Sequence, residues 1–528
     1  MFRIYFFKHV SLRYFNTVSS DVRVRFAPSP TGVLHLGGLR TAFFNYLFAR
    51  KNQGKFILRI EDTDRKRIKP GSREILNGML EWSGIIPDES PEMGGQYGPY
   101  VQSERLQIYH EKADLLLKSG AAYRCFCSET RLEILRKEAL HTRESRGYDN
   151  KCRHLDPSEI DQLLKEGKSY TIRFKIPEGP ISHSDIVFGQ QTYNVSENEG
   201  DFIILKSDGF PTYHFASVVD DHLMKISHVL RGTEWLISTP KHILLYQALN
   251  WQPPKFAHLP LLTNSDRSKL SKRQESIGIE YFKDKGYSPI ALLNFLGVAG
   301  GGFGRQEGFI TYDLPSLCAK FNLESVNTGS CIVDLRKLDI FNHNYLIQQL
   351  SDETSTAHLI QELRAILKKK YGKRYENEQK NLSDSYIKKI LLCYKDRMCT
   401  LNHLTEPDME YIWTTVEWEE ISEKLTSLNI SPSIVAKLKS VADFLSSLPN
   451  AEFTQDNLNN NLKNMSKDLN VPFSSLMRAL RVVLTAQKNG PGVSEIIDIL
   501  GKKRCLEKIY FVVEKSESML QNLHQNKN

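Results

Sequence analysis

The order of apolar and polar positions after residue 21 predicts a strand, a loop, a helix and a second strand. Residues 22–26 (VRVRF) alternate, which places the valines and phenylalanine on one face and the arginines on the other. The segment 27–32 (APSPTG) cannot continue a strand, and residues 39–50 then show helical spacing before a second apolar strand at 55–60. The predicted buried face of the helix is Phe43, Phe44, Leu47 and Phe48. A strand–helix–strand unit of about 40 residues predicts a parallel sheet with its ligand crevice at the carboxyl ends of the strands.

The pattern changes twice further along the chain. Residues 109–204 combine a cysteine cluster, a charged helical stretch and short strands, which indicates an insertion, and the α/β pattern resumes near Gly209. From about Gly286 onward amphipathic helical patterns dominate, for example at 345–363, 386–401 and 494–509. The second half is therefore predicted to be mainly helical, without a repeat of fixed period.

Composition places the chain among ordinary globular proteins of several domains. It has 528 residues, 40% of them hydrophobic and 25% charged, which excludes the disordered, collagen-like and disulfide-dense classes. No stretch approaches the roughly 20 apolar residues of a membrane span, so no membrane association is expected. The net charge of +8 suits a polyanionic partner but does not establish one.

Residues 1–20 are typical of a mitochondrial presequence. They contain three basic residues and no acidic one, and they end in threonine and serines. This predicts a transit peptide and a location in the mitochondrial matrix, although an ordinary basic N-terminal strand or helix has the same composition. The eight cysteines are mostly scattered, as expected of reduced thiols.

Two segments that are far apart in the sequence predict a site for a nucleoside triphosphate. The chain has neither GxxxxGK[ST] nor a GxGxxG after its first strand. Instead, PSPTG leads into His35-Leu36-Gly37-Gly38 at the start of the first helix, where free backbone N–H groups favour an anion. Residues 269–273 (KLSKR) form a triply basic loop suited to phosphate charge. Taken alone, His35 could instead be a capping or core histidine. Taken alone, residues 269–273 could instead be a basic loop on the surface.

These two motifs resemble the signature motifs of class I aminoacyl-tRNA synthetases. Five stretches (RFAPSPTGVLHLGGLRTA, LRIEDTD, GPYVQSERL, KSDGFPTYHFASVVDDHL and RGTEW) are similar to bacterial-type glutamyl-tRNA synthetases of the organellar branch. The resemblance implies an α/β Rossmann-type catalytic domain, an inserted α+β acceptor-binding domain and an all-α anticodon-binding region. The expected organisation is a transit peptide (1–20), the first catalytic half (21–108), the insertion (109–205), the second catalytic half (206–285), a stem-contact helical domain (286–344) and the anticodon-binding domain (345–528).

Glutamate carries two carboxylates and one ammonium, so its pocket needs forked cationic donors and one anion. Arg25 and Arg231 supply guanidinium groups, Tyr213 a hydroxyl and Glu61 a carboxylate. Without the family, Arg25 would most simply face solvent and Glu61 would pair with a neighbouring arginine. The resemblance implies a glutamate site made of Arg25, Phe26, Ala27, Glu61, Tyr213, His214, Phe215, Ala216, Ser217 and Arg231. Ser217 departs from relatives that have asparagine or another small residue there.

The resemblance also implies ATP and Mg²⁺ as cofactors and a two-step reaction through glutamyl-adenylate. No side-chain nucleophile is required, because the work is positioning and charge stabilisation. The expected catalytic residues are His35, Lys269 and Lys272. The expected ATP-binding residues are His35, Gly37, Glu234, Lys269, Leu270, Ser271, Lys272 and Arg273.

Two further groups of residues are candidates for binding metal and tRNA. Cys125, Cys127, Cys152 and His154 have a C-x-C, C-x-H layout that suits tetrahedral Zn²⁺, and some bacterial relatives bind structural zinc with it. The alternative is three reduced cysteines and a surface histidine. By resemblance, Arg397 and Arg481 fall in segments that face the anticodon.

The sequence thus predicts a monomeric enzyme that attaches glutamate to mitochondrial tRNA(Glu). Whether tRNA(Gln) is a second substrate stays open. A catalytically silent tRNA-binding paralogue and an enzyme that glutamylates a modified tRNA base are the alternatives.

Overall fold

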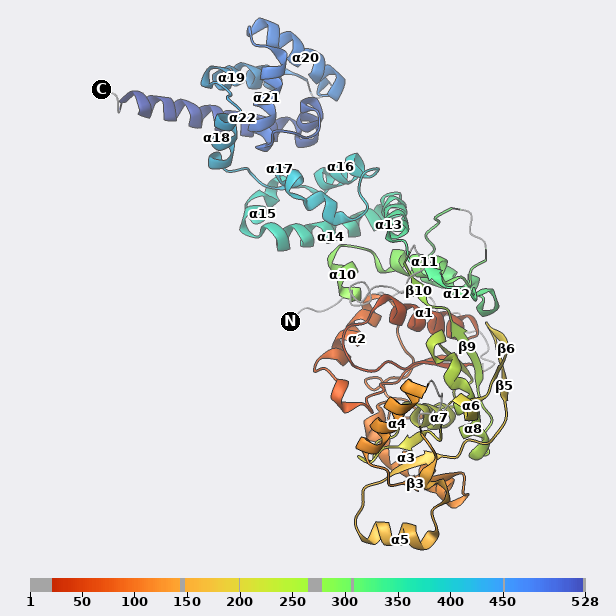
Figure 1. Cartoon of the computed structure of the whole chain (residues 1–528). Coiled ribbons are helices and arrows are strands. Elements are labelled where there is room, and N and C mark those ends of the chain that lie inside the picture. Colours follow the sequence, from red (N-terminus) through yellow and green to blue (C-terminus); the bar gives the residue numbers. More distant parts are fainter. Residues whose placement is uncertain are drawn as a thin grey trace. The chain divides into compact units, whose positions relative to one another are not determined.

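A computed structural model describes residues 21–142, 148–198, 200–264, 278–304, 308–449 and 452–525 (Figure 1). The chain divides into two compact units, Met1–Phe341 and Asn342–Asn528. The predicted presequence and the predicted loop 269–273 lie outside the described residues.

Two parallel strand pairs form the centre of the first unit. Strand β1 (Arg23–Phe26) pairs with β2 (Lys55–Leu58), and helix α1 (Leu36–Lys51) connects them. Strand β8 (His228–Gly232) pairs with β9 (Lys255–Leu259), and helix α8 (Thr239–Ala248) connects them. The N–H of Ser227 donates to the carbonyl of Arg23 at 2.9 Å and joins the starts of the two pairs. The predicted strand–helix–strand unit is confirmed, and the carboxyl ends of all four strands face the same side.

A hairpin extends this sheet at one edge. Strands β5 (Ile181–Asp185) and β6 (Gly189–Tyr193) are antiparallel, and the order is β6-β5-β9-β8. Asp185 on β5 is aligned with Phe256 on β9 in a parallel pairing. Part of the range 109–205, predicted as an insertion, is therefore built into the catalytic sheet.

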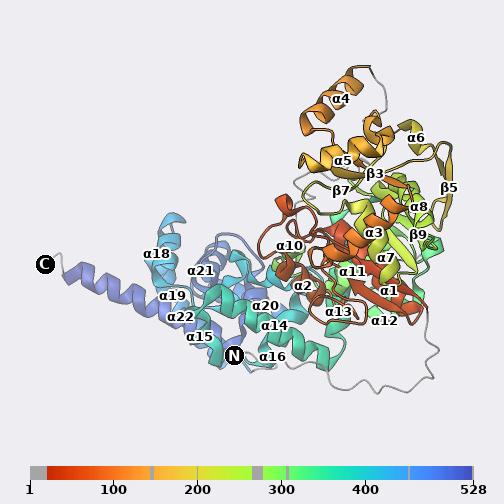
Figure 2. The ribbon, with the colours of Figure 1, turned by 90° about the horizontal axis from the view of Figure 1, so that it is seen from below.

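The rest of that range forms a separate antiparallel sheet. Its strands are β3 (Ala122–Cys125), β4 (Thr171–Phe174) and β7 (Ile203–Leu205), in the order β3-β4-β7. Helices α4 (Glu129–Thr142) and α5 (Pro157–Lys165) accompany it. Figures 1 and 2 show α4 and α5 at the end of the first unit opposite α11 (Pro289–Gly300) and α12 (Leu314–Lys320).

Helix α1 is fixed at its start and along its length. The Nδ1 atom of His35 accepts the N–H of Gly38 at 3.2 Å, which caps the helix. Phe43, Phe44 and Leu47 are fully buried as predicted, whereas Phe48 is half-buried. The buried amide of Asn45 donates to the carbonyl of Leu230 at 3.1 Å. This bond holds α1 against β8, beside the carboxyl ends of the strands.

Helices form the second unit. The predicted helix at 345–363 is two helices, because α13 (Leu335–Leu350) ends and Asp352 caps α14 (Glu353–Tyr371) by accepting the N–H of Ser355 at 2.8 Å. The other helices are α15 (Lys373–Glu378), α16 (Asp384–Tyr394), α17 (Glu410–Trp413), α18 (Trp418–Ser427), α19 (Pro432–Ser447), α20 (Gln455–Asp468), α21 (Phe473–Thr485) and α22 (Val493–Gln525). Gly501 breaks α22 with a φ of 76°, a left-handed conformation that glycine adopts readily. Among the described helices none is long and apolar enough to span a membrane.

Candidate active site

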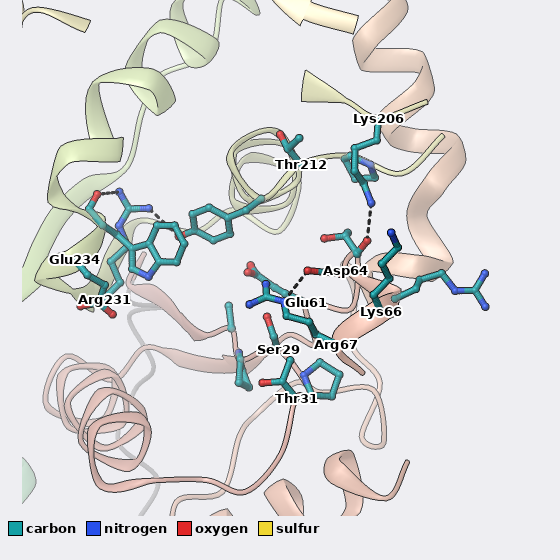
Figure 3. A pocket seen from close by; sticks show the side chains of 18 of the residues that line it. Ser29, Thr31, Glu61, Asp64, Lys66, Arg67, Lys206, Thr212, Arg231 and Glu234 are labelled. Atoms are coloured by element: carbon teal, nitrogen blue, oxygen red, sulfur yellow. Dashed lines mark hydrogen bonds and ion pairs between the residues drawn. The ribbon is translucent and has the colours of Figure 1, made fainter. Parts of the chain in front are cut away.

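A cavity of about 1920 Å³ opens at the carboxyl ends of the parallel strands. Figure 3 shows Arg231 and Glu234 on one side of it, Lys66, Arg67 and Lys206 on the opposite side, and Glu61 between them. The predicted site residues that line it are Arg25, Phe26, Ala27, His35, Gly37, Glu61, Tyr213, Arg231 and Glu234. Residues from both predicted halves of the catalytic domain thus meet in one space.

Four predicted glutamate-site residues lie behind the cavity wall, on α7 (Tyr213–Leu223). Phe215, Ala216 and Ser217 are buried, and His214 packs against His242 with Nδ1 and Nε2 3.1 Å apart. The Ser217 hydroxyl has no hydrogen-bond partner among the described residues. These residues support the wall of the cavity rather than facing its interior.

Arg231 is a buried cation held by neutral groups. Its Nε donates to His258 Nε2 at 3.0 Å. Its Nη2 donates to Thr239 Oγ1 at 2.9 Å and to the carbonyl of Trp235 at 3.3 Å. Arg231 is 5% exposed, and within the described ranges no carboxylate forms an ion pair with its guanidinium. Among the described residues, no acidic side chain therefore compensates its positive charge by direct pairing.

The remaining side of Arg231 meets Tyr213 and His242. Nη1 donates to the Tyr213 hydroxyl and to His242 Nδ1, both at 3.2 Å. Because the tyrosine oxygen accepts this bond, its own proton is available to an acceptor in the cavity. Burial, with Arg231 nearby, lowers the pKa of His242 well below its ordinary value. His242 thus stays neutral and adds no competing charge.

Arg25 is held differently, by a buried acid. Its Nε and Nη2 donate to the two carboxylate oxygens of Asp221 at 3.0 and 3.3 Å. Its Nη1 has no hydrogen-bond partner in the part of the chain that the structure describes, and Arg25 lines the cavity. Nη1 is therefore the group that Arg25 offers to a ligand.

Glu61 combines the two roles considered from the sequence. Its Oε1 accepts from Arg59 Nη2 at 3.0 Å, and the side chain also lines the cavity. Burial raises the pKa of Glu61, against the opposing effect of Arg59 and Arg25. The carboxylate can accept an ammonium through its second oxygen.

Sequence reasoning missed the buried ionic network beneath the cavity. Arg59, fully buried, donates to Asp221 at 2.7 Å. Asp220 accepts from Arg105 Nε at 2.7 Å and from the Tyr109 hydroxyl at 2.8 Å. The adjacent acids in the otherwise apolar stretch VVDDHL were the signal that pointed to it.

The other end of the cavity suits a nucleotide. Nδ1 of His35 accepts from Gly38, so the ring proton is on Nε2, and His35 is exposed at the start of α1. Glu234 is exposed in a short 3₁₀ helix (Thr233–Ser238). Arg40 also lines this end; it is 3% exposed, and its Nε and Nη1 have no hydrogen-bond partner among the described residues.

Comparison with known proteins agrees with this geometry. Residues 21–339 match the family described as tRNA synthetases class I (E and Q), catalytic domain, and residues 356–513 match an anticodon binding domain. The chain belongs to the class I glutamyl- and glutaminyl-tRNA synthetase family. Within it, the chain is similar to proteins named glutamate–tRNA ligase: 38% identical to that of Alkaliphilus metalliredigens (94% of this chain, 99% of the relative) and 39% to that of Chloroherpeton thalassium (94% and 98%).

A solved structure is also similar to this synthetase along its length. The crystal structure of a glutamate tRNA ligase from Elizabethkingia meningosepticum in complex with its amino acid matches with a TM-score of 0.76 and 33% identity, covering 94% of this chain and 99% of that one. The chain is therefore a class I aminoacyl-tRNA synthetase with glutamate–tRNA ligase activity, with a Rossmann-like catalytic domain and an all-helical anticodon-binding domain.

Three of the four predicted zinc ligands of the synthetase come together. One ligand atom from each of Cys125, Cys127 and Cys152 lies within 4.8 Å of the others, and the Cys127 and Cys152 sulfurs are 3.6 Å apart. Tetrahedral Zn²⁺ with Zn–S bonds of about 2.3 Å needs sulfurs about 3.8 Å apart, so the thiols fit. His154 is exposed and outside this group, and the Tyr148 hydroxyl lies 3.2 Å from the Cys125 sulfur instead.

The two predicted anticodon residues lie in the second unit. Arg397 follows α16; its side chain is 66% exposed and pairs with Glu495 at 3.3 Å. Arg481 on α21 donates to the carbonyl of Pro491 at 2.5 Å. The exposed Arg397 can exchange its surface ion pair for a ligand at low cost.

Proposed function

We propose that this enzyme charges mitochondrial tRNA(Glu) and binds glutamate in the cavity between Arg231, Arg25 and Glu61. The observation that carries this is the uncancelled charge of Arg231. A buried cation without an anionic partner is costly, and a ligand carboxylate relieves that cost. The amide of glutamine lacks this charge, so binding glutamine leaves the guanidinium uncompensated.

The ligand's polar groups match the available protein groups. The side-chain carboxylate accepts a hydrogen bond from the Tyr213 hydroxyl. It also accepts from Nη1 and Nη2 of Arg231, where it replaces the longer contacts that these atoms make within the protein. Nη1 of Arg25 donates to the same end of the ligand. The ammonium is placed against the second oxygen of Glu61, which leaves the α-carboxylate directed at the nucleotide end.

ATP is placed over the turn that His35 and Gly37 form at the start of α1. The α-carboxylate of glutamate attacks the α-phosphorus, the bond to the bridging oxygen breaks, and pyrophosphate leaves. His35 Nε2 donates to the phosphate oxygens while Lys269 and Lys272 stabilise the charge that builds on them. Mg²⁺ bound to the triphosphate supplies further neutralisation. The 2′-hydroxyl of the tRNA terminus then attacks the adenylate carbonyl, and AMP leaves.

The basic, acid-free segment 1–20 supports a location in the mitochondrial matrix, where this segment is removed. We also propose that the enzyme is a monomer and that tRNA(Gln) is a second substrate. The thiols of Cys125, Cys127 and Cys152 support one structural Zn²⁺ per chain, with Tyr148 closer to the fourth position than His154.

The test is aminoacylation by the purified enzyme with mitochondrial tRNA(Glu) and tRNA(Gln) side by side. Charging of both is expected. Charging of tRNA(Glu) alone refutes the second substrate. Absence of tRNA-dependent ATP–pyrophosphate exchange indicates a silent paralogue, and transfer of glutamate to an internal base rather than to the 3′ terminus indicates a modifying enzyme.

A further inference from the structure

Three neighbouring strands place an acid, a histidine and an arginine in a row. In the parallel register Arg231 on β8 is aligned with His258 on β9, and β9 is flanked on its other side by β5, which carries Asp185. Asp185 Oδ2 lies 2.6 Å from His258 Nδ1, and His258 Nε2 lies 3.0 Å from Arg231 Nε. The side chains of Asp185 and His258 are fully buried.

The acid decides which nitrogen of His258 carries the proton. An ionised carboxylate only accepts, so His258 Nδ1 must donate to Asp185. The Nε2 lone pair is then free to accept from Arg231, whose nitrogens only donate. Burial lowers the pKa of His258 to about 4 in spite of this hydrogen bond, so the ring is neutral at neutral pH. Burial opposes ionisation of Asp185 as well, but its hydrogen bonds with His258 and the N–H of Phe188 hold its pKa below the ordinary value.

We propose that Asp185 and His258 are positioning residues that aim Arg231 at the substrate carboxylate without neutralising it. The proposal rests on the function proposed above. Asp185 acts through the imidazole: its hydrogen-bond partners among the described residues are Val187, Phe188 and His258, and none of them lines the cavity.

The contrast with Arg25 explains why an intervening ring is useful. Asp221 binds Arg25 directly through two hydrogen bonds, and the pair is close to neutral. If an acid bound Arg231 in the same way, a substrate carboxylate would have to compete with it. A neutral histidine fixes the Nε direction of Arg231 and leaves the full charge for the ligand.

Asp185 also shapes the β5–β6 hairpin, which determines the choice of variant. Its Oδ1 accepts the N–H groups of Val187 and Phe188 at 3.0 and 2.9 Å. Asparagine keeps this oxygen, so Asp185→Asn preserves the turn. Its amide NH₂ then faces His258 Nδ1 and forces the other tautomer, which turns an N–H toward Arg231 Nε. The change therefore alters the tautomer and leaves the hairpin intact.

The experiment measures glutamate and ATP KM in the aminoacylation of tRNA(Glu) by the full chain. In Asp185→Asn, the hydrogen bond from Arg231 Nε to His258 Nε2 is replaced by two donors that face each other. The glutamate KM of this variant is therefore expected to rise about 10- to 100-fold, with the ATP KM unchanged. The matched control is His183→Phe, two residues earlier on β5. His183 is 8% exposed and neither ring nitrogen has a hydrogen-bond partner among the described residues, so its glutamate KM should stay near that of the wild type.

Nitrogen NMR of labelled histidine gives a readout that a general loss of structure does not imitate. The wild type should show His258 protonated at Nδ1, and Asp185→Asn should show it protonated at Nε2. An unchanged glutamate KM in Asp185→Asn, or equal rises in glutamate and ATP KM, overturns the proposal. Arg231→Gln separates the proposed glutamate site from the proposed positioning role. If both Arg231→Gln and Asp185→Asn leave the glutamate KM unchanged, the glutamate site itself is wrong. If Asp185→Asn leaves it unchanged and Arg231→Gln raises it, only the positioning role is wrong.

Discussion

Replacement of Asp221 by asparagine is expected to destabilise the catalytic unit strongly. Asp221 is 3% exposed and accepts hydrogen bonds from both Arg25 and Arg59. In Asp221→Asn, the three buried cations Arg25, Arg59 and Arg105 face only two acids, Glu61 and Asp220. The amide also places a donor against a guanidinium donor.

The expected loss in the free energy of unfolding is about 3–5 kcal/mol, which is the usual cost of removing one partner of a buried ion pair. For a unit of this size that corresponds to about 4–8 °C in the unfolding midpoint, measured by differential scanning calorimetry. The control is Asp208→Asn, because the Asp208 side chain is 58% exposed and pairs with Lys206 at the surface. A change within about 0.5 kcal/mol is expected there.

The pH dependence has a definite sign. Burial opposes ionisation of Asp221, but Arg25 and Arg59 outweigh it and hold its pKa below the ordinary value. Its stabilisation is therefore fully present above the unfolded pKa of about 3.9 and is lost as the pH falls through the lower folded pKa. An Asp221→Asn protein that unfolds at the wild-type temperature at pH 7 would refute this reasoning.

Three further predictions follow from the same geometry. Glu61→Gln should raise the glutamate KM about tenfold or more, because the neutral amide cannot pair with the ammonium as a carboxylate does; steady-state kinetics measures this, and an unchanged glutamate KM contradicts the role of Glu61. His35→Asn keeps an N-cap acceptor, so its unfolding temperature should stay at the wild-type value while kcat falls about 100-fold or more. His35→Ala should show the same fall in kcat and should also lose about 0.5–2 kcal/mol of stability, because it removes the cap. A kcat near the wild-type value in His35→Asn contradicts the phosphate role. Metal analysis should find one zinc per chain in the wild type and in His154→Ala but a reduced content in Cys127→Ser and Tyr148→Phe; equal zinc in all four proteins would show that the metal does not bind at this cluster.

The first strand–helix–strand unit could be predicted because its signals are local, whereas the set of cavity residues was predicted from the resemblance to the synthetase family. Alternation identifies β1, and helical spacing identifies the buried face of α1. Parallel strands place a ligand crevice at their carboxyl ends, and the resemblance assigned Arg25 and Arg231 to it. The motif around His35 then orients the nucleotide end.

Other features depend on pairing between distant segments. Nothing local in 181–193 shows that this hairpin extends the sheet beside β9, so the hydrogen bonds that connect Asp185 to His258 and His258 to Arg231 were not predictable. The metal cluster shows the same limit. Cys152 and His154 lie in one 3₁₀ turn (Lys151–His154), where residues two apart point about 240° from each other, so the histidine turns away from the thiols.

The most direct test of the glutamate site is the ratio of kcat/KM for glutamate to that for glutamine, measured by tRNA(Glu) charging with wild-type enzyme and with Arg231→Gln. The uncancelled buried charge predicts that the substitution lowers this ratio about 100-fold or more, mainly through loss of glutamate. A ratio that stays at the wild-type value would contradict the assignment of Arg231 as the group that selects the carboxylate.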